Sequence, residues 1–306
     1  MKRIVVTGAS SFIGTYLIQK LLEDKETEIY AVIRPHSANR NRVPQDAWVK
    51  IVELDMAEVD KLPSLIGCDV DGFYHLAWNG TRGDSRDDEN KQRENYEASL
   101  QAAKAAQEMH AKMFLGSGSQ AEYGFVSDTV SESDEAKPNT AYGRMKKQTY
   151  EALKEYFRDT PVKLYWVRIF SVFGPEDYEG TLIMSSLAKM RKNEKLALTE
   201  CSQDWDYIYI RDVADALAKF SLTKAEEGIY NVASGKIRPL KDFVLEMKEI
   251  LHSDSEIAFG AVPYGSAGPV HLRPDVTKIQ TQLEWQAKTE FADGIREILE
   301  KKWRKS

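Results

Sequence analysis

Cysteine is scarce in this 306-residue chain, which contains only two, Cys68 and Cys201. They lie far apart in the sequence without the spacing of metal ligands, so the sequence predicts neither a disulfide framework nor a metal site. Internal repeats and low-complexity segments are also missing. Any chemistry must therefore come from residues other than cysteine.

An excess of positive charge is missing as well. The 42 Lys and Arg residues face 48 Asp and Glu residues, which gives a net charge of −6. This balance argues against nucleic acid or an anionic membrane as the main partner. No apolar run approaches the roughly 18 residues that span a bilayer, and no signal peptide precedes the first predicted strand. We therefore expect a cytoplasmic protein that does not contact membranes.

The composition itself is that of a globular protein, with 42% hydrophobic and 29% charged residues. Apolar runs of strand length alternate with segments of helix length. The helices are expected to begin near Phe12, Asp60, Glu94 and Tyr142. Because these runs are apolar on both faces, they predict a parallel sheet covered by helices on both sides. The predicted strands cover residues 4–7, 29–33, 49–53, 72–76, 112–117 and 162–169.

The predicted fold class is therefore α/β, a doubly wound parallel sheet of the Rossmann type with a smaller C-terminal α/β lobe. We predict that residues 1–170 form a dinucleotide-binding domain and that residues 206–233 return to it. Residues 171–205 and 234–306 are predicted to form a substrate-binding lobe.

A glycine-bearing turn follows the first strand, with Gly8 and Gly14 six positions apart. Such a turn lets backbone N–H groups at a helix N-terminus bind a pyrophosphate. Ser11 stands where a third glycine is common, so either its hydroxyl bonds a phosphate or the backbone stands farther away. The predicted cofactor contacts in this segment are Gly8, Ser10, Ser11, Phe12, Ile13 and Gly14.

Arg34 follows the second strand, where an acidic residue would bind the ribose 2′-hydroxyl of NAD. An arginine there suits a 2′-phosphate, so we predict NADP(H) as the preferred cofactor. The alternative, a solvated basic loop containing Arg34, Arg40 and Arg42, leaves NAD(H) possible. After the third strand, Asp55 is a candidate acceptor for the adenine amino group, and Met56 is a candidate to pack on the adenine ring.

Tyr142 and Lys146 are four residues apart, which places a phenol and an ammonium group on one helix face. A nearby cation favours the phenolate, so we expect Lys146 to lower the pKa of Tyr142. The pair could then exchange a proton with a carbonyl or hydroxyl group. Ser119 follows a parallel strand at the edge where such sheets bind ligands, and its hydroxyl could orient the same substrate oxygen.

Together these motifs resemble the extended short-chain dehydrogenase/reductase family, in particular its NAD(P)-dependent sugar-nucleotide epimerase/dehydratase branch. The likeness covers almost the whole chain. It implies that Tyr142 is the acid-base residue, that Ser119 assists at the substrate oxygen and that Lys146 also binds the nicotinamide ribose. Further positions that carry the resemblance, and that it places at the cofactor, are Leu76, Ala77 and Asn95.

Departures from the family pattern narrow the reaction. Dehydratases of this branch usually follow the catalytic Ser or Thr with an Asp-Glu pair, but here Gln120 and Ala121 stand there and Glu122 comes one place too late. With Arg34 favouring NADPH, the leading hypothesis is reduction of the 4-keto group of a nucleotide-diphospho-4-keto-6-deoxyhexose for polysaccharide or glycoside biosynthesis. The alternatives are an NAD-dependent sugar-nucleotide epimerase and, third, a non-enzymatic sensor of nicotinamide redox state.

The predicted partner is a nucleotide-diphosphate sugar. Ser171 and Trp205 replace an asparagine and an arginine that relatives commonly place at the substrate diphosphate, which leaves Arg168, Arg238 and Arg273 as candidate cations. Arg273 matches the C-terminal arginine of the family best, and Trp205 could instead be a core residue. The resemblance also implies a homodimer through a four-helix contact. The predicted substrate contacts are Trp78, Gln120, Ser171, Trp205 and Arg273.

Overall fold

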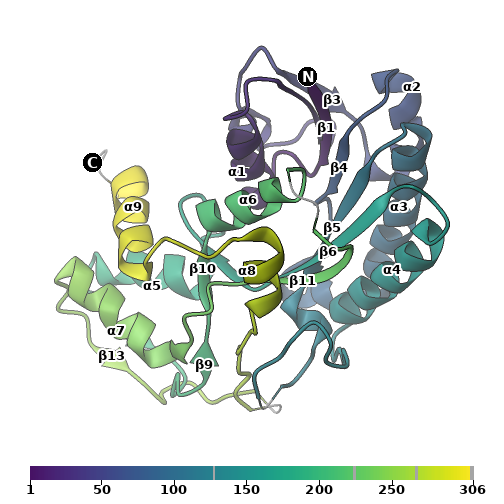
Figure 1. The fold of residues 1–306 in the computed structure, drawn as a ribbon. Helices are drawn as coiled ribbons and strands as arrows, with labels where there is room; N and C mark the ends of the chain where they lie inside the picture. The colour runs from purple at the N-terminus through teal and green to yellow at the C-terminus, as the bar shows by residue number, and fades with distance from the viewer. Residues whose placement is uncertain (127, 223–224, 266–267, 304–306) are drawn as a thin grey trace.

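A seven-stranded parallel sheet forms the centre of the protein (Figure 1), whose computed structural model describes residues 1–126, 128–222, 225–265 and 268–303. The strand order is β11-β6-β5-β4-β1-β2-β3. The chain runs outward from β1 to β3 and then returns to place β4 on the other side of β1, which is the doubly wound arrangement predicted. The strands are β1 (Lys2–Thr7), β2 (Thr27–Ile33), β3 (Val49–Glu53), β4 (Gly72–His75), β5 (Met113–Ser119), β6 (Lys163–Ile169) and β11 (Gly228–Val232).

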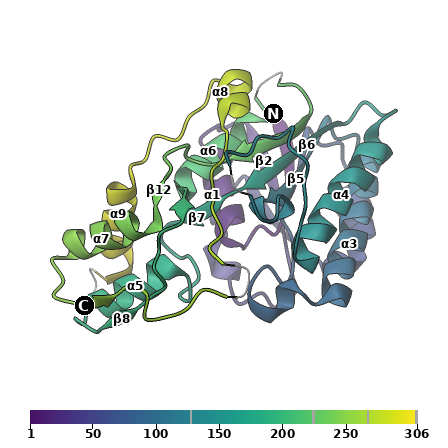
Figure 2. The same ribbon diagram turned by 90° about the horizontal axis from the view of Figure 1, so that it is seen from below.

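Helices cover both faces of this sheet, as Figure 2 shows from below. On one face, α1 (Phe12–Leu21), α6 (Ile210–Lys219) and α8 (Thr277–Leu283) pack against the inward side chains of β1, β2 and β4. On the other face lie α2 (Leu62–Ile66), α3 (Glu89–Glu108) and α4 (Ala141–Phe157). Successive residues of β1 point to opposite faces, so Val5 joins one core and Val6 the other.

Three small two-stranded sheets and three helices form a second group of elements beside the large sheet (Figure 1). Its helices α5 (Leu182–Met190), α7 (Leu240–Leu251) and α9 (Phe291–Trp303) share a third apolar core. Between the strands of this group, β11 joins the large sheet beside β6. The strand pairs are β7 (Ser171–Phe173) with β10 (Tyr207–Tyr209), β9 (Asp204–Trp205) with β12 (Arg238–Pro239), and β8 (Leu196–Ala197) with β13 (Ile257–Ala258).

Several predicted boundaries are wrong. Helix α3 begins at Glu89 instead of near Glu94, because the Asp88 side chain caps it by accepting a hydrogen bond from the Lys91 N–H at 3.1 Å. The helix expected near Asp60 is a 3₁₀ helix, η2 (Met56–Lys61), followed by the single-turn-length α2. Strand β5 continues to Ser119. None of the described helices is long and apolar enough to cross a membrane.

Candidate active site

A cleft of about 620 Å³ opens where β1 and β4 end, at the point where the strand order reverses. Ligands of open α/β sheets bind at this point. Ten of the residues predicted from the sequence line the cleft: Gly8, Ser10, Ser11, Arg34, Asp55, Met56, Leu76, Ala77, Trp78 and Asn95.

The glycine turn brings β1 close to the residues after β4. Gly8 has a φ of +68°, and a Cβ at this position would lie 2.8 Å from the backbone nitrogen of Ala77. The backbone here is therefore free of side-chain bulk, as a bound pyrophosphate requires. The Ser11 hydroxyl accepts a hydrogen bond from the Gly14 N–H at 3.1 Å, so it caps α1 while its own hydrogen stays available for a phosphate.

Phe12 and Ile13, the first two residues of α1, do not line the cleft with their side chains. Both side chains pack against the third apolar core. Their backbone N–H groups, at the N-terminus of the helix, are the contacts that they can offer to a phosphate.

Arg34 lies exposed at the end of β2 and lines the cleft together with Ser37 and Asn39. The other two arginines of this loop are engaged elsewhere, since Arg40 pairs with Glu53 and Arg42 lies 3.8 Å from a Glu176 carboxylate oxygen. Arg34 has no ion pair with any residue that the structure describes. Of the three arginines of this loop, Arg34 is thus the one that lines the cleft.

The Asn95 side chain makes hydrogen bonds with the backbone of Asn79. Its side-chain oxygen accepts from the Asn79 N–H at 2.7 Å, and its amide nitrogen donates to the Asn79 carbonyl at 2.8 Å. These bonds fix the segment after β4 that forms one wall of the cleft. Asp55, which also lines the cleft, caps η2, because its carboxylate oxygen accepts from the Ala57 N–H at 3.0 Å.

The structure brings Ser119, Tyr142 and Lys146 together. Ser119 ends β5 and caps the 3₁₀ helix η4 (Gln120–Glu122), whereas Tyr142 and Lys146 lie on α4. The two helices touch at Gly143, where a Cβ would lie 2.4 Å from the Ala121 carbonyl oxygen. Any side chain at residue 143 would push apart the helices that carry the serine and the tyrosine.

The predicted electrostatic effect of Lys146 on Tyr142 is wrong. Burial raises the pKa of Tyr142, against the opposing effects of a hydrogen bond with Ser119 and of the Arg86 charge. Lys146 is 2% exposed, and burial holds its pKa well below the usual range. Its Nζ donates to the Ser117 carbonyl at 2.5 Å and lies 3.5 Å from the centre of the Trp78 ring, but 5.8 Å from that of Tyr142. The ammonium is thus directed at Trp78 and Ser117.

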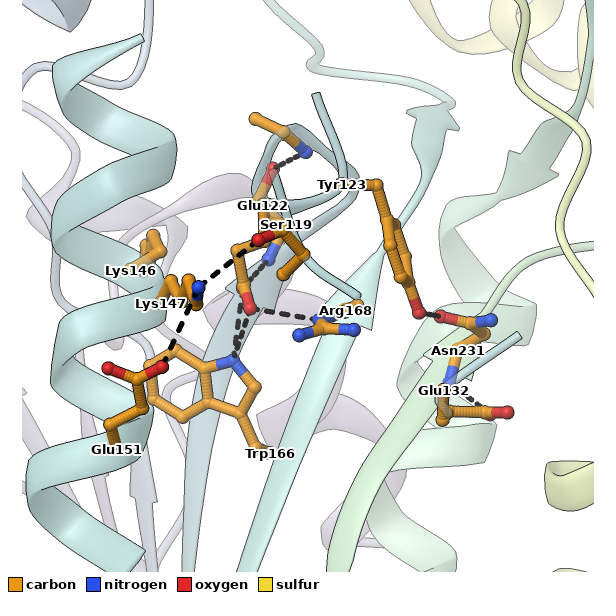
Figure 3. Close-up of polar contacts among 12 residues, drawn as sticks. Ser119, Glu122, Tyr123, Glu132, Lys146, Lys147, Glu151, Trp166, Arg168 and Asn231 are labelled. Carbon is orange, nitrogen blue, oxygen red and sulfur yellow. Dashed lines mark hydrogen bonds and ion pairs between the residues drawn. The ribbon is translucent and has the colours of Figure 1, made fainter. Parts of the chain in front are cut away.

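Glu122 is fully buried, and Figure 3 shows its contacts with Trp166 and Arg168 of β6. Its carboxylate accepts from the Ser119 N–H at 2.8 Å, from Trp166 Nε1 at 3.0 Å and from Arg168 Nε at 2.9 Å. It therefore holds η4 on β6. Since Arg168 is bonded to Glu122 and 3% exposed, it is not the substrate cation that the sequence offered as a candidate.

The residues predicted to bind substrate fall into two groups. Trp78 and Gln120 adjoin the three catalytic candidates: the Trp78 ring meets Tyr142 edge-on at 6.1 Å, and Gln120 follows Ser119 in η4. Ser171 and Trp205 lie on β7 and β9, in the second group of elements, whereas Arg273 lies in the segment before α8.

Trp205 packs against apolar clusters, but its buried Nε1 makes no hydrogen bond with a described residue. In the β9–β12 pair its register partner is Arg238, which pairs with Glu246. Arg273 pairs with Asp204 at 2.5 Å.

Three residues at the site were not predicted from the sequence: two that line the cleft and one that contacts Tyr142. Ser37 and Asn39 line the cofactor cleft, and Arg86 lies over the Tyr142 ring at 5.1 Å. Arg86 belongs to a segment rich in charged residues, 84–94. Its spacing does not distinguish it from Arg82 or Arg93, so its position depends on how the loop folds.

The family model described as NAD dependent epimerase/dehydratase matches residues 4–233, three quarters of the chain. The chain belongs to this family. It is thus an enzyme of the extended short-chain dehydrogenase/reductase type, as its motifs predict. The redox sensor, the third reading of the sequence, is thereby set aside.

Relatives within and around this family extend the likeness to nearly the full length. CDP-abequose synthase of Salmonella muenchen is 26% identical over 98% of both chains. UDP-glucuronic acid decarboxylase 5 of Arabidopsis thaliana is 22% identical over 96% of this chain and 87% of its own. A solved UDP-glucose 4-epimerase of Thermotoga maritima, 20% identical, superposes with a TM-score of 0.87 over 99% of both chains, which confirms the fold.

Proposed function

We propose that this enzyme reduces the 4-keto group of a nucleotide-diphospho-4-keto-6-deoxyhexose with NADPH. The observation that carries the proposal is the set of groups around the reacting position. Ser119 offers a hydroxyl group that can bond the substrate oxygen, and Tyr142 offers a proton donor. The two positions after Ser119, where dehydratases usually carry an Asp-Glu pair, are Gln120 and Ala121. Glu122, the nearest carboxylate in sequence, is bonded to Trp166 and Arg168. The site thus offers proton transfer at one oxygen without the acid and base that eliminate water.

The cleft fits a dinucleotide, because the turn at Gly8 has no space for a side chain and ends at the N-terminus of α1. Gly8, Ser10, Ser11, the backbone of residues 12–14, Leu76 and Ala77 would hold the pyrophosphate half. Arg34 would bind the 2′-phosphate, with Asp55 and Met56 at the adenine. The bound cofactor would supply the hydride that adds to the carbonyl carbon.

Tyr142 would give its proton to the carbonyl oxygen as the ketone becomes an alcohol. The raised pKa of Tyr142 keeps this phenol protonated at neutral pH, as a donor must be. Ser119 would donate a hydrogen bond to the same oxygen, and Lys146 would bind the nicotinamide ribose. Trp78, Gln120, Ser171, Trp205 and Arg273 are the proposed substrate contacts, with Arg273 facing the diphosphate.

The likeness to CDP-abequose synthase over both full lengths supports a nucleotide-linked sugar as the substrate. A second candidate is a nucleotide-sugar 4-epimerase, favoured by the solved epimerases that share the fold. In that case the cofactor would be tightly bound NAD, and Arg34 would be a solvated loop residue.

We further propose a homodimer formed through α3 and α4. The cytoplasmic location and the division into a dinucleotide domain and a substrate lobe stay predictions.

The test is the number of NADPH molecules oxidised for each sugar converted, measured on a panel of nucleotide-linked 4-keto-6-deoxyhexoses. The proposal expects one NADPH for each sugar. Conversion of the sugar without net oxidation of NADPH would identify an epimerase.

Tyr142→Phe should lower kcat by about 100-fold or more, because it removes the proton donor. Tyr150→Phe, on the same helix, is the matched control and should keep its activity.

A further inference from the structure

We infer that Arg86 is a working part of this active site: its guanidinium stabilises the negative charge that forms on Tyr142 when this residue gives up its proton. The inference rests on the proposed role of Tyr142 as proton donor. Arg86 belongs to η3 (Gly83–Arg86), in the loop after β4, and is the cation nearest to the tyrosine ring among the described residues.

The position of Arg86 is the first argument. The carbon of its guanidinium lies 5.1 Å from the centre of the Tyr142 ring, within the range of a cation–π contact. Its Nε is buried and makes no hydrogen bond with any described residue. A buried donor without a partner has a cost, which is expected where the group serves a function instead of the fold.

The second argument is that the loop is held in place on both sides of Arg86. Gln92, which is fully buried, donates to the carbonyls of Gly80 and Ser85, each at 2.8 Å. Asp87, the residue after Arg86, accepts a hydrogen bond from the N–H of Ala141 at 3.0 Å. Because Ala141 immediately precedes Tyr142, this bond ties the loop to the helix turn that carries the tyrosine.

The third argument concerns the other charges near Tyr142. Lys146, which its spacing from Tyr142 in the sequence predicts as the stabilising cation, is directed at Trp78 and the Ser117 carbonyl. Glu122 is the acidic group whose charge acts on the ring, and it opposes deprotonation. A guanidinium stays charged at every working pH, whereas a buried ammonium loses its proton more readily. Arg86 is thus the cation suited to a tyrosinate here.

The experiment is a pH titration of tyrosinate absorbance in the full chain, without substrate. The signal of Tyr142 is obtained by subtracting the titration of a Tyr142→Phe protein, and the same subtraction is made in Arg86→Gln, Arg86→Lys and Arg93→Gln backgrounds. Arg93 is exposed on α3 and is the control for loss of one positive charge.

We expect the titration of Tyr142 to move to higher pH in Arg86→Gln, to return most of the way in Arg86→Lys, and to stay unchanged in Arg93→Gln. In the reductase assay, kcat should fall roughly 3- to 30-fold in Arg86→Gln, the range of a desolvated cation–π contact. An unchanged titration in Arg86→Gln would overturn the inference. Equal shifts in the Gln and Lys variants would also overturn it, since they would show an effect of loop shape instead of charge.

The two proposals fail separately in this design. A shifted titration without net oxidation of NADPH would refute the reductase and leave the role of Arg86 standing. Stoichiometric oxidation of NADPH with an unmoved titration would do the reverse.

Discussion

Glu122 carries a carboxylate that no water reaches, and its partner Arg168 is almost as deeply buried. Each charge is tolerated because the other neutralises it, and the remaining lone pairs accept hydrogen bonds from Ser119 and Trp166. The pair connects the end of β5 to β6. The pair therefore helps to position Ser119, whose N–H donates to the Glu122 carboxylate.

Glu122→Gln should lower the free energy of unfolding by about 3–5 kcal/mol, because it leaves the Arg168 charge buried and unpaired. Urea denaturation measures the change. Glu151→Gln, at an exposed position on α4, is the control and should change stability little. A double variant, Glu122→Gln with Arg168→Gln, should recover part of the loss. If Glu122→Gln is as stable as the parent, the Glu122 carboxylate is not needed to neutralise the buried Arg168 charge, and the prediction is wrong.

The proposed preference for NADPH depends on Arg34. Arg34→Ala should raise the KM for NADPH by about 10- to 100-fold, the value of a charge-assisted hydrogen bond, and leave the KM for NADH unchanged. Steady-state kinetics with each cofactor measures this. Arg40→Ala removes a neighbouring arginine that pairs with Glu53 and should affect neither cofactor. Equal losses with both cofactors would argue for a role in the fold of the loop.

At the scale of elements, prediction from sequence succeeds where the signal is local. The strands of the large sheet are continuous apolar runs, and the turn at Gly8 has a backbone conformation that its glycine favours. Strands β7 and β9 have only two or three residues, and α8 has seven residues and no side-chain cap. Such elements exist because of their tertiary partners, so local pattern could not show them. Arg86 was missed for the same reason.

His75 joins three elements through its ring. Nδ1 lies 2.9 Å from the Thr7 hydroxyl of β1, and Nε2 lies 3.0 Å from the Ser99 hydroxyl of α3. Ser99 donates its hydrogen to the Asn95 carbonyl, so it accepts from Nε2, and Nδ1 accepts from Thr7. The ring is therefore neutral and has no place for a second proton.

Burial lowers the pKa of His75 from 6.5 to about 3. In the unfolded chain the ring takes up a proton below about pH 6.5, whereas the folded protein does not. Its stabilising effect is thus complete above pH 6.5, and stability should fall by about 1.4 kcal/mol for each pH unit below it. Urea denaturation at pH 7 and pH 5 should show a smaller loss in His75→Gln than in the parent.

At the scale of the whole molecule, α3 and α4 present an open hollow of about 420 Å³ on the outer side of the sheet. Leu100, Ala152 and Tyr156 give it a mostly apolar lining. Helices that pack on a sheet with one face and remain apolar on another are suited to a partner copy related by a two-fold axis. This is the surface on which the proposed homodimer depends.

We expect Leu100→Asp to convert the proposed dimer to a monomer, because it places a charge in the apolar hollow. Light scattering after size-exclusion chromatography measures the mass. Leu65→Asp introduces the same charge at an exposed leucine of α2 and should leave the dimer intact. A parent protein that is already monomeric at micromolar concentration would contradict the proposed dimer.

The edge strand β11 and its cover come late in the chain. Strand β6 has β11 as its outer neighbour, some 60 residues further on, and α8 with Trp285 packs on the same side of the sheet. During synthesis the outer edge of β6 therefore stays open until residues 228–232 leave the ribosome, and this face stays uncovered until about residue 285 follows. Unpaired edges in nascent chains are where aggregation begins. The order of the strands along the chain therefore makes the outer edge of β6 the last part of the large sheet to be paired during synthesis.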